Sequence, residues 1–303
     1  MYYRFFILLF LSFSNLHSQD WNLSKDEKDK WDLDKTVNIQ KRNILLVSEA
    51  SIYLTSILAL NKLWYANYPK SDFHFINDNS EWLQMDKVGH IATSYYAGVL
   101  GIKSYRWTGM NDNSAIWYGG LTGTFFLTII EVLDGYSAEW GASSGDLVSN
   151  SFGSLLAISQ ELYWEEQRIQ IKYSYSPSRW AHKNPEQLGR NNIERVLKDY
   201  NGQTYWLSFN VQSLFNIRDI DVPDWFNVSI GYSGDNMITP SRSLETSDFR
   251  ERQYFLSFDI DMTKIRTRNK ILNNILHLFG FLKFPAPAIE LRNGDIYLHS
   301  IYY

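Results

Sequence analysis

The sequence contains no cysteine. This absence excludes disulfide bonds, a thiol nucleophile, a thiolate metal site and a lipid-modified cysteine among these residues. A metal ion would therefore have to bind histidine, aspartate, glutamate or amide oxygen atoms. The sequence does not identify a cofactor, and a divalent metal is the one candidate that these residue types suggest.

A large charge of either sign is also missing. The 303 residues carry a formal net charge of −4, and no stripe of basic residues interleaved with aromatics, typical of nucleic-acid binding, is present. We expect no nucleic-acid partner. Aromatic residues, in contrast, are abundant at 16%. Tyrosine and tryptophan favour places where one end is apolar and the other wet, so this composition favours an envelope or membrane-interface protein.

Residues 1–19 have the pattern of a secretory signal peptide. Arg4 precedes an apolar run, and a small polar stretch with a plausible cleavage point after Ser18 follows it. The apolar run is too short to span a bilayer, so export is the better interpretation. Residues 20–41 are charged, without sustained periodicity, and we expect a solvated lead-in there.

Residues 42–164 contain long apolar runs that predict a bundle of about four helices. The expected helices run from Arg42 to Trp64, from about Asp86, from Ser114 to Leu133, and from just after Gly145. Hydropathy does not separate a buried core helix from a short membrane span. Both a membrane-embedded bundle and a soluble bundle therefore fit this region.

Beyond Trp164 the period of the apolar residues changes to two, which is typical of strands with one apolar face. Several such segments precede a terminal hairpin with a turn at Asn293-Gly294. Residues 165–303 are therefore predicted to form an antiparallel sheet of five or six strands, and the whole chain an α+β fold. Helical insertions are expected at Asn191–Tyr200 and Lys264–Lys283. The second is basic and amphipathic, so it could lie on a membrane or cover the sheet.

Three polar clusters interrupt the apolar helices of the first region. They are Asp86 with His90, Glu131 with Asp134, and Asp146 with Asn150. Members of each pair are three or four residues apart and so share one helix face. Buried polar groups must find partners, so the meeting of these faces would form either a structural network or a binding site.

Taken in order, the clusters resemble the motifs of a known family. The matching pattern is Asp86-Lys87-x-x-His90, then Glu131-x-x-Asp134, then Asp146-x-x-x-Asn150-x-x-Gly153. It resembles the YfiM-like family of predicted periplasmic lipoproteins and, more distantly, VanZ-type membrane proteins, over about residues 40–165. The resemblance implies a helical envelope domain with no established reaction. The chain departs from the family label in having no cysteine, and from the VanZ pattern in having Asp134 where glutamine is usual.

The clusters suggest specific roles. His90 with Glu131 or Asp134 could act as a general base with an orienting carboxylate, and Asp86, Asp146 and Asn150 would then be ligand or network residues. A divalent metal could instead bind His90, Glu131, Asp134 and Asp146. The bland alternative is that both aspartates only satisfy free N–H groups at helix starts, Asp86 as an N-cap and Asp146 within a Ser143-x-x-Asp146 capping box. Glu131 lies in an apolar helix and needs a partner such as His90 or Asn150.

These observations lead to one functional interpretation and one alternative. The first is an exported, membrane-associated protein of the periplasm, at the outer membrane rather than the inner, with a structural or assembly role around a buried polar centre. The alternative is an envelope hydrolase or metal-binding protein that acts on a lipid-linked or cell-wall substrate. Enzymatic activity stays open, and the expected partners are membrane or envelope components.

Overall fold

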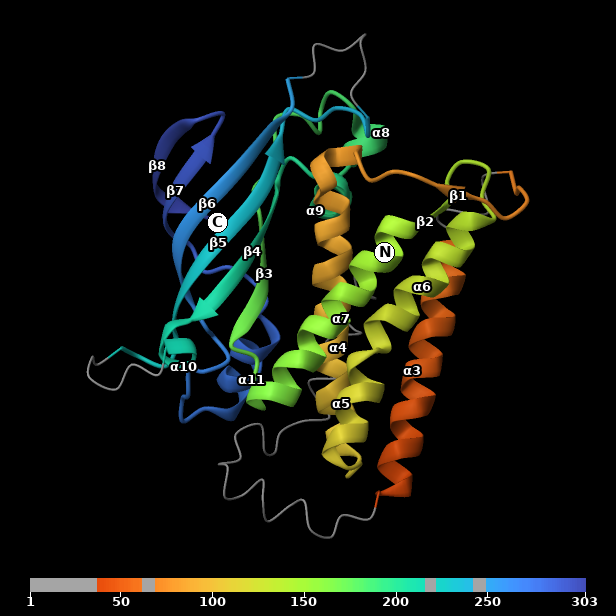
Figure 1. Cartoon of the computed structure of the whole chain (residues 1–303), viewed down its shortest axis with the longest axis vertical. Coiled ribbons are helices and arrows are strands. Elements are labelled where there is room, and N and C mark those ends of the chain that lie inside the picture. Colours follow the sequence, from red (N-terminus) through yellow and green to blue (C-terminus); the bar gives the residue numbers. More distant parts are fainter. Residues whose placement is uncertain (1–36, 62–68, 216–221, 242–248) are drawn as a thin grey trace. The chain divides into compact units, whose positions relative to one another are not determined.

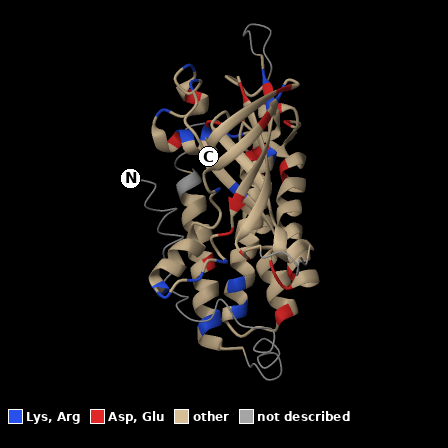
Figure 2. Ribbon diagram, turned by 90° about the vertical axis from the view of Figure 1, so that its left-hand side faces the viewer, with Lys and Arg blue, Asp and Glu red and all other residues tan. Residues whose placement is uncertain are grey.

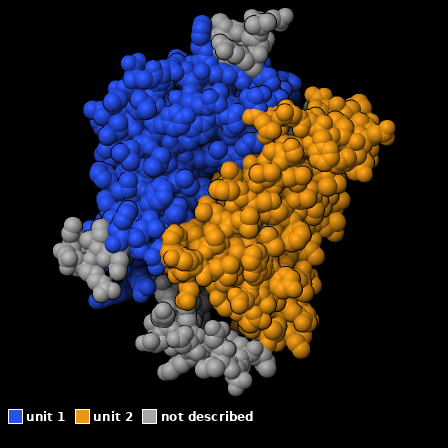
Figure 3. Space-filling model, in the orientation of Figure 1, with its two compact units in different colours: residues 1–18, 80–89, 167–303 blue, residues 19–79, 90–166 orange. Residues whose placement is uncertain are grey.

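The computed structural model describes residues 37–61, 69–215, 222–241 and 249–303 (Figure 1). The predicted signal peptide, residues 1–19, and most of the lead-in, residues 20–41, lie outside the described residues. The described residues belong to two compact units, shown in different colours in Figure 3. The helical unit comprises residues up to 79 and residues 90–166; the sheet unit comprises residues 80–89 and those from 167 onward. Residues 80–89 thus group with the sheet, although the predicted domain ranges placed them with the helices.

The described part of the predicted helical region contains five α-helices. In chain order they are α3 (Ile39–Leu60), α4 (Met85–Trp107), α5 (Asp112–Gly120), α6 (Thr122–Gly135) and α7 (Ser144–Trp164). Polar side chains cap three of them, because the oxygens of Asn38, Asn111 and Ser143 accept hydrogen bonds from the first turns of α3, α5 and α7. The helix expected from Ser114 to Leu133 is divided at Leu121.

The bundle of about four apolar helices is not shown in that form. Besides the division at Leu121, helix α4 carries charged residues at both ends, among them Lys87 and Arg106. Long stretches of the other helices have no charge (Figure 2). By length and composition, one stretch of the described chain, Asp112–Gly135, could cross a membrane, although core helices of soluble proteins share these properties.

Glycines allow the helices to approach each other closely. A Cβ atom at Gly101 of α4 would collide with the backbone oxygen of Gly119 in α5, and one at Gly123 of α6 would collide with the backbone of Ser94 in α4. Larger residues at these positions would force the helices apart. The close contact fixes the spacing between α4 and its neighbours, and α4 carries the first polar cluster.

The sheet unit is built on six antiparallel strands in sequence order. They are β3 (Ile169–Tyr175), β4 (Gln203–Asn210), β5 (Phe226–Asp235), β6 (Glu251–Ile260), β7 (Ala286–Arg292) and β8 (Asp295–Tyr302). The helical insertions are α8 (Pro185–Leu188), α9 (Asn192–Lys198), α10 (Val211–Phe215) and α11 (Lys270–Leu278). The α+β fold and the antiparallel sheet are thereby confirmed. Asn293 and Gly294 have positive φ, as a tight two-residue hairpin turn requires.

The sheet is strongly curved, and its two faces have an inverted polarity. Tyr302 of β8 lies 4.4 Å, ring centre to ring centre, from Phe255 of β6, and its hydroxyl is 3.2 Å from Thr204 Oγ1 of β4. The outer face instead exposes a row of apolar residues that pair directly across five strands: Leu207, Ile230, Leu256, Ile289 and Leu298.

The interior of the curved sheet holds buried charges. Lys172 and Asp259, both fully buried, form an ion pair of 3.0 Å, and the Lys283 ammonium lies 3.9 Å from the same carboxylate. Burial lowers the pKa of Lys283 to about 8, and the negative charge of Asp259 opposes this effect. Lys283 also donates to Ser257 Oγ and to two backbone carbonyls. These bonds satisfy the buried ammonium groups, so the network holds the sheet together.

Candidate functional site

The first polar cluster follows an unusual left-handed turn. Three consecutive non-glycine residues have positive φ: Trp82 (46°), Leu83 (51°) and Gln84 (64°). Each such residue costs about 1–2 kcal/mol relative to the right-handed form. The turn is held by hydrogen bonds from Trp82 N to Pro240 O, from the Tyr232 hydroxyl to Leu83 O, and from Arg252 Nη2 to Gln84 Oε1. All of these residues belong to the sheet unit, so the sheet fixes the turn from which α4 begins.

His90 of α4 is oriented by Asn150 of α7. His90 Nδ1 is 2.9 Å from Asn150 Oδ1. An amide oxygen can only accept a hydrogen bond, so Nδ1 carries a proton, and in the neutral form of the ring the lone pair is on Nε2. Asn150 is completely buried, and its Nδ2 has no hydrogen-bond partner among the described residues. The centre therefore offers a lone pair on Nε2 of the neutral ring and a buried N–H group of Asn150 that can donate to a further partner.

Asp146 of α7 is the carboxylate beside His90. Its Oδ1 is 3.7 Å from His90 Nε2, and its side chain is only 6% exposed. It is not the cap of α7, because the Ser143 hydroxyl accepts the hydrogen bond from the Asp146 backbone N–H. The Ser143 half of the capping box is thus present, whereas the Ser143 backbone N–H donates to Glu131 and not to the Asp146 carboxylate.

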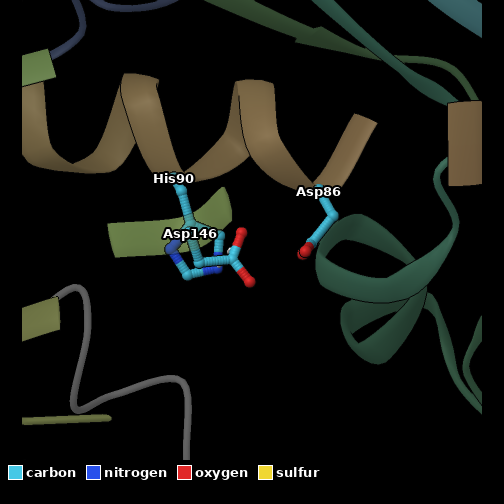
Figure 4. Close-up of side chains that lie close together, drawn as sticks. All are labelled: Asp86, His90 and Asp146. Atoms are coloured by element: carbon cyan, nitrogen blue, oxygen red, sulfur yellow. Dashed lines mark ion pairs between the residues drawn. The ribbon is translucent and has the colours of Figure 1, made fainter. Parts of the chain in front are cut away.

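Asp86 lies one turn before His90 on the same helix. Because α4 continues without a break from Asp86 to His90, the helix itself sets their spacing (Figure 4). One ligand atom from each of Asp86, His90 and Asp146 lies within 4.8 Å of the others. The Asp86 carboxylate also accepts hydrogen bonds from the Tyr200 hydroxyl, at 2.7 Å, and from Lys87.

Glu131 of α6 is buried close by, but its partner is a backbone group. It is 3% exposed, and its Oε2 accepts a hydrogen bond of 2.9 Å from Ser143 N. Its pKa is raised to about 7, mainly by burial and further by the negative charges of Asp146 and Asp134; the bond from Ser143 and the charge of His90 act in the opposite direction. At neutral pH this carboxyl can therefore both take up and release a proton.

The structure selects among the residues that the sequence suggested. His90, Asp146 and Asn150 meet as the spacing indicated, and Asp86 joins them as a possible metal ligand. Glu131 and Asp134 of the predicted metal set are not members of this ligand group. Asp134 acts through its charge on Glu131. The assignment of catalytic and metal roles to these residues stays a prediction.

Two further residues surround the centre: Ser143, which the capping-box spacing indicated, and Asp78, which sequence reasoning did not find. Ser143 caps α7, donates its backbone N–H to Glu131, and donates its hydroxyl to Asp78 Oδ1 at 2.6 Å. The Ser143-x-x-Asp146 spacing signals the cap. The contact with Asp78 depends on the short parallel pairing of β1 (Phe75–Ile76) with β2 (Ala142–Ser143), which has no clear sequence signal.

Comparison with known proteins supports the predicted location. Residues 72–161 match the model of a family described as predicted periplasmic lipoprotein (DUF2279). The matched segment contains all three polar clusters but less than one third of the 303 residues. It supports an exported, periplasmic, membrane-associated cell-envelope protein of unknown function. No curated protein and no solved structure matches the chain. The narrower resemblance to YfiM-like and VanZ-type proteins stays a prediction, and so does the preference for the outer membrane.

Proposed function

We propose that this cell-envelope protein binds a divalent metal ion through His90 and Asp146, with Asp86 as a third ligand. The observation that carries the proposal is the hydrogen bond from His90 Nδ1 to Asn150 Oδ1, which turns the Nε2 lone pair toward Asp146. Histidines that bind metals in proteins are held in this way by a second residue. The nitrogen and carboxylate donors suit a transition metal such as zinc or manganese.

The buried amide of Asn150 favours a binding site over a purely structural network. A buried N–H group without a partner costs about 1–3 kcal/mol. A network that served stability alone would satisfy it. A water molecule or a ligand oxygen bound at the centre would accept this hydrogen bond, and a metal ion would hold such an oxygen in place.

The neighbouring carboxylates also favour a cation. The charge of Asp146 raises the pKa of Glu131, which means that the two carboxylates repel each other when both are ionised. A bound divalent cation would remove this repulsion. Metal binding should therefore be tighter at higher pH, where Glu131 has lost its proton.

Hydrolysis of an envelope substrate is the second candidate function. Glu131, with its pKa near 7, is suited to accept a proton from a water molecule and to return it to a leaving group. The substrate class would be lipid-linked or cell-wall molecules, in keeping with the envelope location. In a third case, a structural or assembly role, a change at the centre would lower stability and function together.

Metal analysis of the purified full chain tests the proposal. We expect about one zinc or manganese ion per chain, and a rise in melting temperature when the ion is added to chelator-treated protein. His90→Ala and Asp146→Asn should abolish both effects. His182→Ala is a matched control, because His182 is exposed and lies in the sheet unit.

Two results would contradict the proposal. One is the absence of metal and of any thermal shift in the wild-type chain. The other is equal loss of the shift in the His182 variant, which would indicate binding elsewhere. If metal is absent but Glu131→Gln abolishes the cellular phenotype at normal stability, the hydrolytic candidate replaces the metal centre.

A further inference from the structure

The chain between Asp261 and Glu290 contains no acidic residue but five basic ones. Lys283 is buried, and Lys264 is half-buried and donates to Ser213 Oγ and Asn210 Oδ1. The other three are exposed and follow one another closely: Arg266, Arg268 and Lys270. This segment therefore presents positive charge to the solvent without an acidic residue of its own.

Helix α11 begins directly at this basic segment and exposes an apolar stripe. Asn269 caps it by accepting hydrogen bonds from Ile271 N and Leu272 N. Ile271, Ile275 and Phe279, spaced four residues apart, lie on one side of the helix and are 70%, 45% and 44% exposed. A helix that covered the sheet would bury this stripe. Of the two interpretations of this insertion, the exposed stripe favours the membrane surface.

The basic segment is held in place relative to the helix. Thr267 N and Thr267 Oγ1 both donate to Asn273 Oδ1, at 2.8 Å and 2.7 Å, and Asn273 Nδ2 donates back to Thr267 O. Thr267 lies between Arg266 and Arg268, so these bonds fix the loop that carries the charges to the second turn of α11. The charges and the stripe thus form one ordered surface.

We propose that this surface, residues 266–279, binds an anionic lipid bilayer. The apolar stripe would lie at the boundary of the acyl chains, and the three cations would contact the phosphates of the headgroups. The charge favours lipid over a second copy of the chain, because an isologous contact would bring two sets of three cations together. The proposal concerns the sheet unit and is independent of the metal centre.

Vesicle flotation of the full chain tests this surface. We expect the chain to float with vesicles that contain phosphatidylglycerol and to bind pure phosphatidylcholine vesicles much more weakly. Each cation near an anionic surface raises membrane affinity about 5-fold. The triple variant Arg266→Gln, Arg268→Gln, Lys270→Gln should therefore bind phosphatidylglycerol vesicles about 100-fold more weakly than the wild type. High salt should also weaken binding of the wild type, because it screens the attraction between the cations and the phosphates.

A matched variant separates local charge from total charge. Arg179→Gln, Lys183→Gln and Arg190→Gln remove three exposed cations from elsewhere in the sheet unit and should leave binding within about twofold of the wild type. The pair Ile275→Ser and Phe279→Ser should weaken binding with an unchanged circular dichroism spectrum. Three results would overturn the proposal. They are equal loss of binding in both charge variants, normal flotation of the variant at residues 266, 268 and 270, and self-association through the stripe in place of lipid binding.

Discussion

Asn150 is the residue that gives the polar centre its direction. Because its amide oxygen holds the proton on His90 Nδ1, replacement by alanine frees the ring to rotate and to change tautomer. Loss of such a second partner typically weakens metal binding about 10–100-fold. We therefore expect Asn150→Ala to lower affinity for zinc by this factor, measured by competition with a chromogenic chelator. Ser159→Ala, on an exposed position of the same helix, should bind like the wild type; an unaffected Asn150 variant would show that the amide does not orient His90.

Glu131 makes stability depend on pH in the metal-free protein. Its folded-state pKa is raised from 4.5 to about 7, so the folded chain holds this proton more tightly than the unfolded chain. The stabilising contribution of protonation is complete below about pH 4.5 and is lost as the pH rises through 7. Glu131→Gln cannot ionise, yet its amide oxygen can still accept the bond from Ser143.

The measurement is urea unfolding of both proteins with a chelator present. Between pH 5 and pH 8 the wild type should lose free energy of unfolding on the order of 1–3 kcal/mol relative to Glu131→Gln. Parallel pH profiles for the two proteins would contradict the raised pKa.

At the scale of elements, the left-handed turn before α4 contains positions where glycine should be more stable than alanine. In an ordinary helix glycine is about 1 kcal/mol less stable than alanine. At Gln84, where φ is 64°, alanine keeps the strain and glycine relieves it. Gln84→Gly should therefore have a free energy of unfolding about 1 kcal/mol higher than that of Gln84→Ala, measured by urea unfolding. At Ser159, inside α7, the same pair of substitutions should show the opposite order; the same order at both sites would rule out strain at the turn.

The inverted sheet predicts opposite effects at two adjacent positions of β6. Phe255 points into the curved interior and is 2% exposed, whereas Leu256 is 48% exposed on the outer face. Phe255→Ala should cost about 3–5 kcal/mol of unfolding free energy, because it leaves a cavity beside Trp206 and Tyr302. Leu256→Ala should cost less than about 1 kcal/mol. Similar losses in both variants would mean that the outer face is covered. Thermal melts of the Leu256 variant in detergent and in buffer would then show whether a detergent takes part in that cover.

At the scale of the whole molecule, the sequence predicts the class of each region better than its orientation. Period-two alternation identifies Tyr254, Leu256 and Phe258 as one face of a strand. It does not tell which face is interior, and here the polar neighbours Ser257 and Asp259 are the buried ones. The inversion is possible because lysines 172 and 283 satisfy Asp259 from other segments, and pairing over that distance has no local signal.

The candidate site shows the same division. Helical spacing brings Asp146 and Asn150 to one face, and the structure places both beside His90. The partner of Glu131 was not foreseen, because it is the backbone N–H of Ser143, a group that every residue except proline carries. Side-chain patterns predict which side chains share a helix face, whereas backbone partners become visible only with the tertiary structure.

The turn at Trp82–Gln84 also sets an order of events for the newly made chain. Its hydrogen bonds reach 149 residues ahead to Tyr232 and 168 residues ahead to Arg252. At about 5–20 residues per second, the chain needs roughly 10–30 seconds after Gln84 to produce these partners. Helix α4 can form from local contacts long before then, but its first turn, with Asp86, takes its final conformation only after β5 and β6 exist. A chain that stops before Phe226 would therefore contain the histidine helix and its glycine contacts with α5 and α6, yet would lack Tyr232, Pro240 and Arg252, the three partners that fix its beginning.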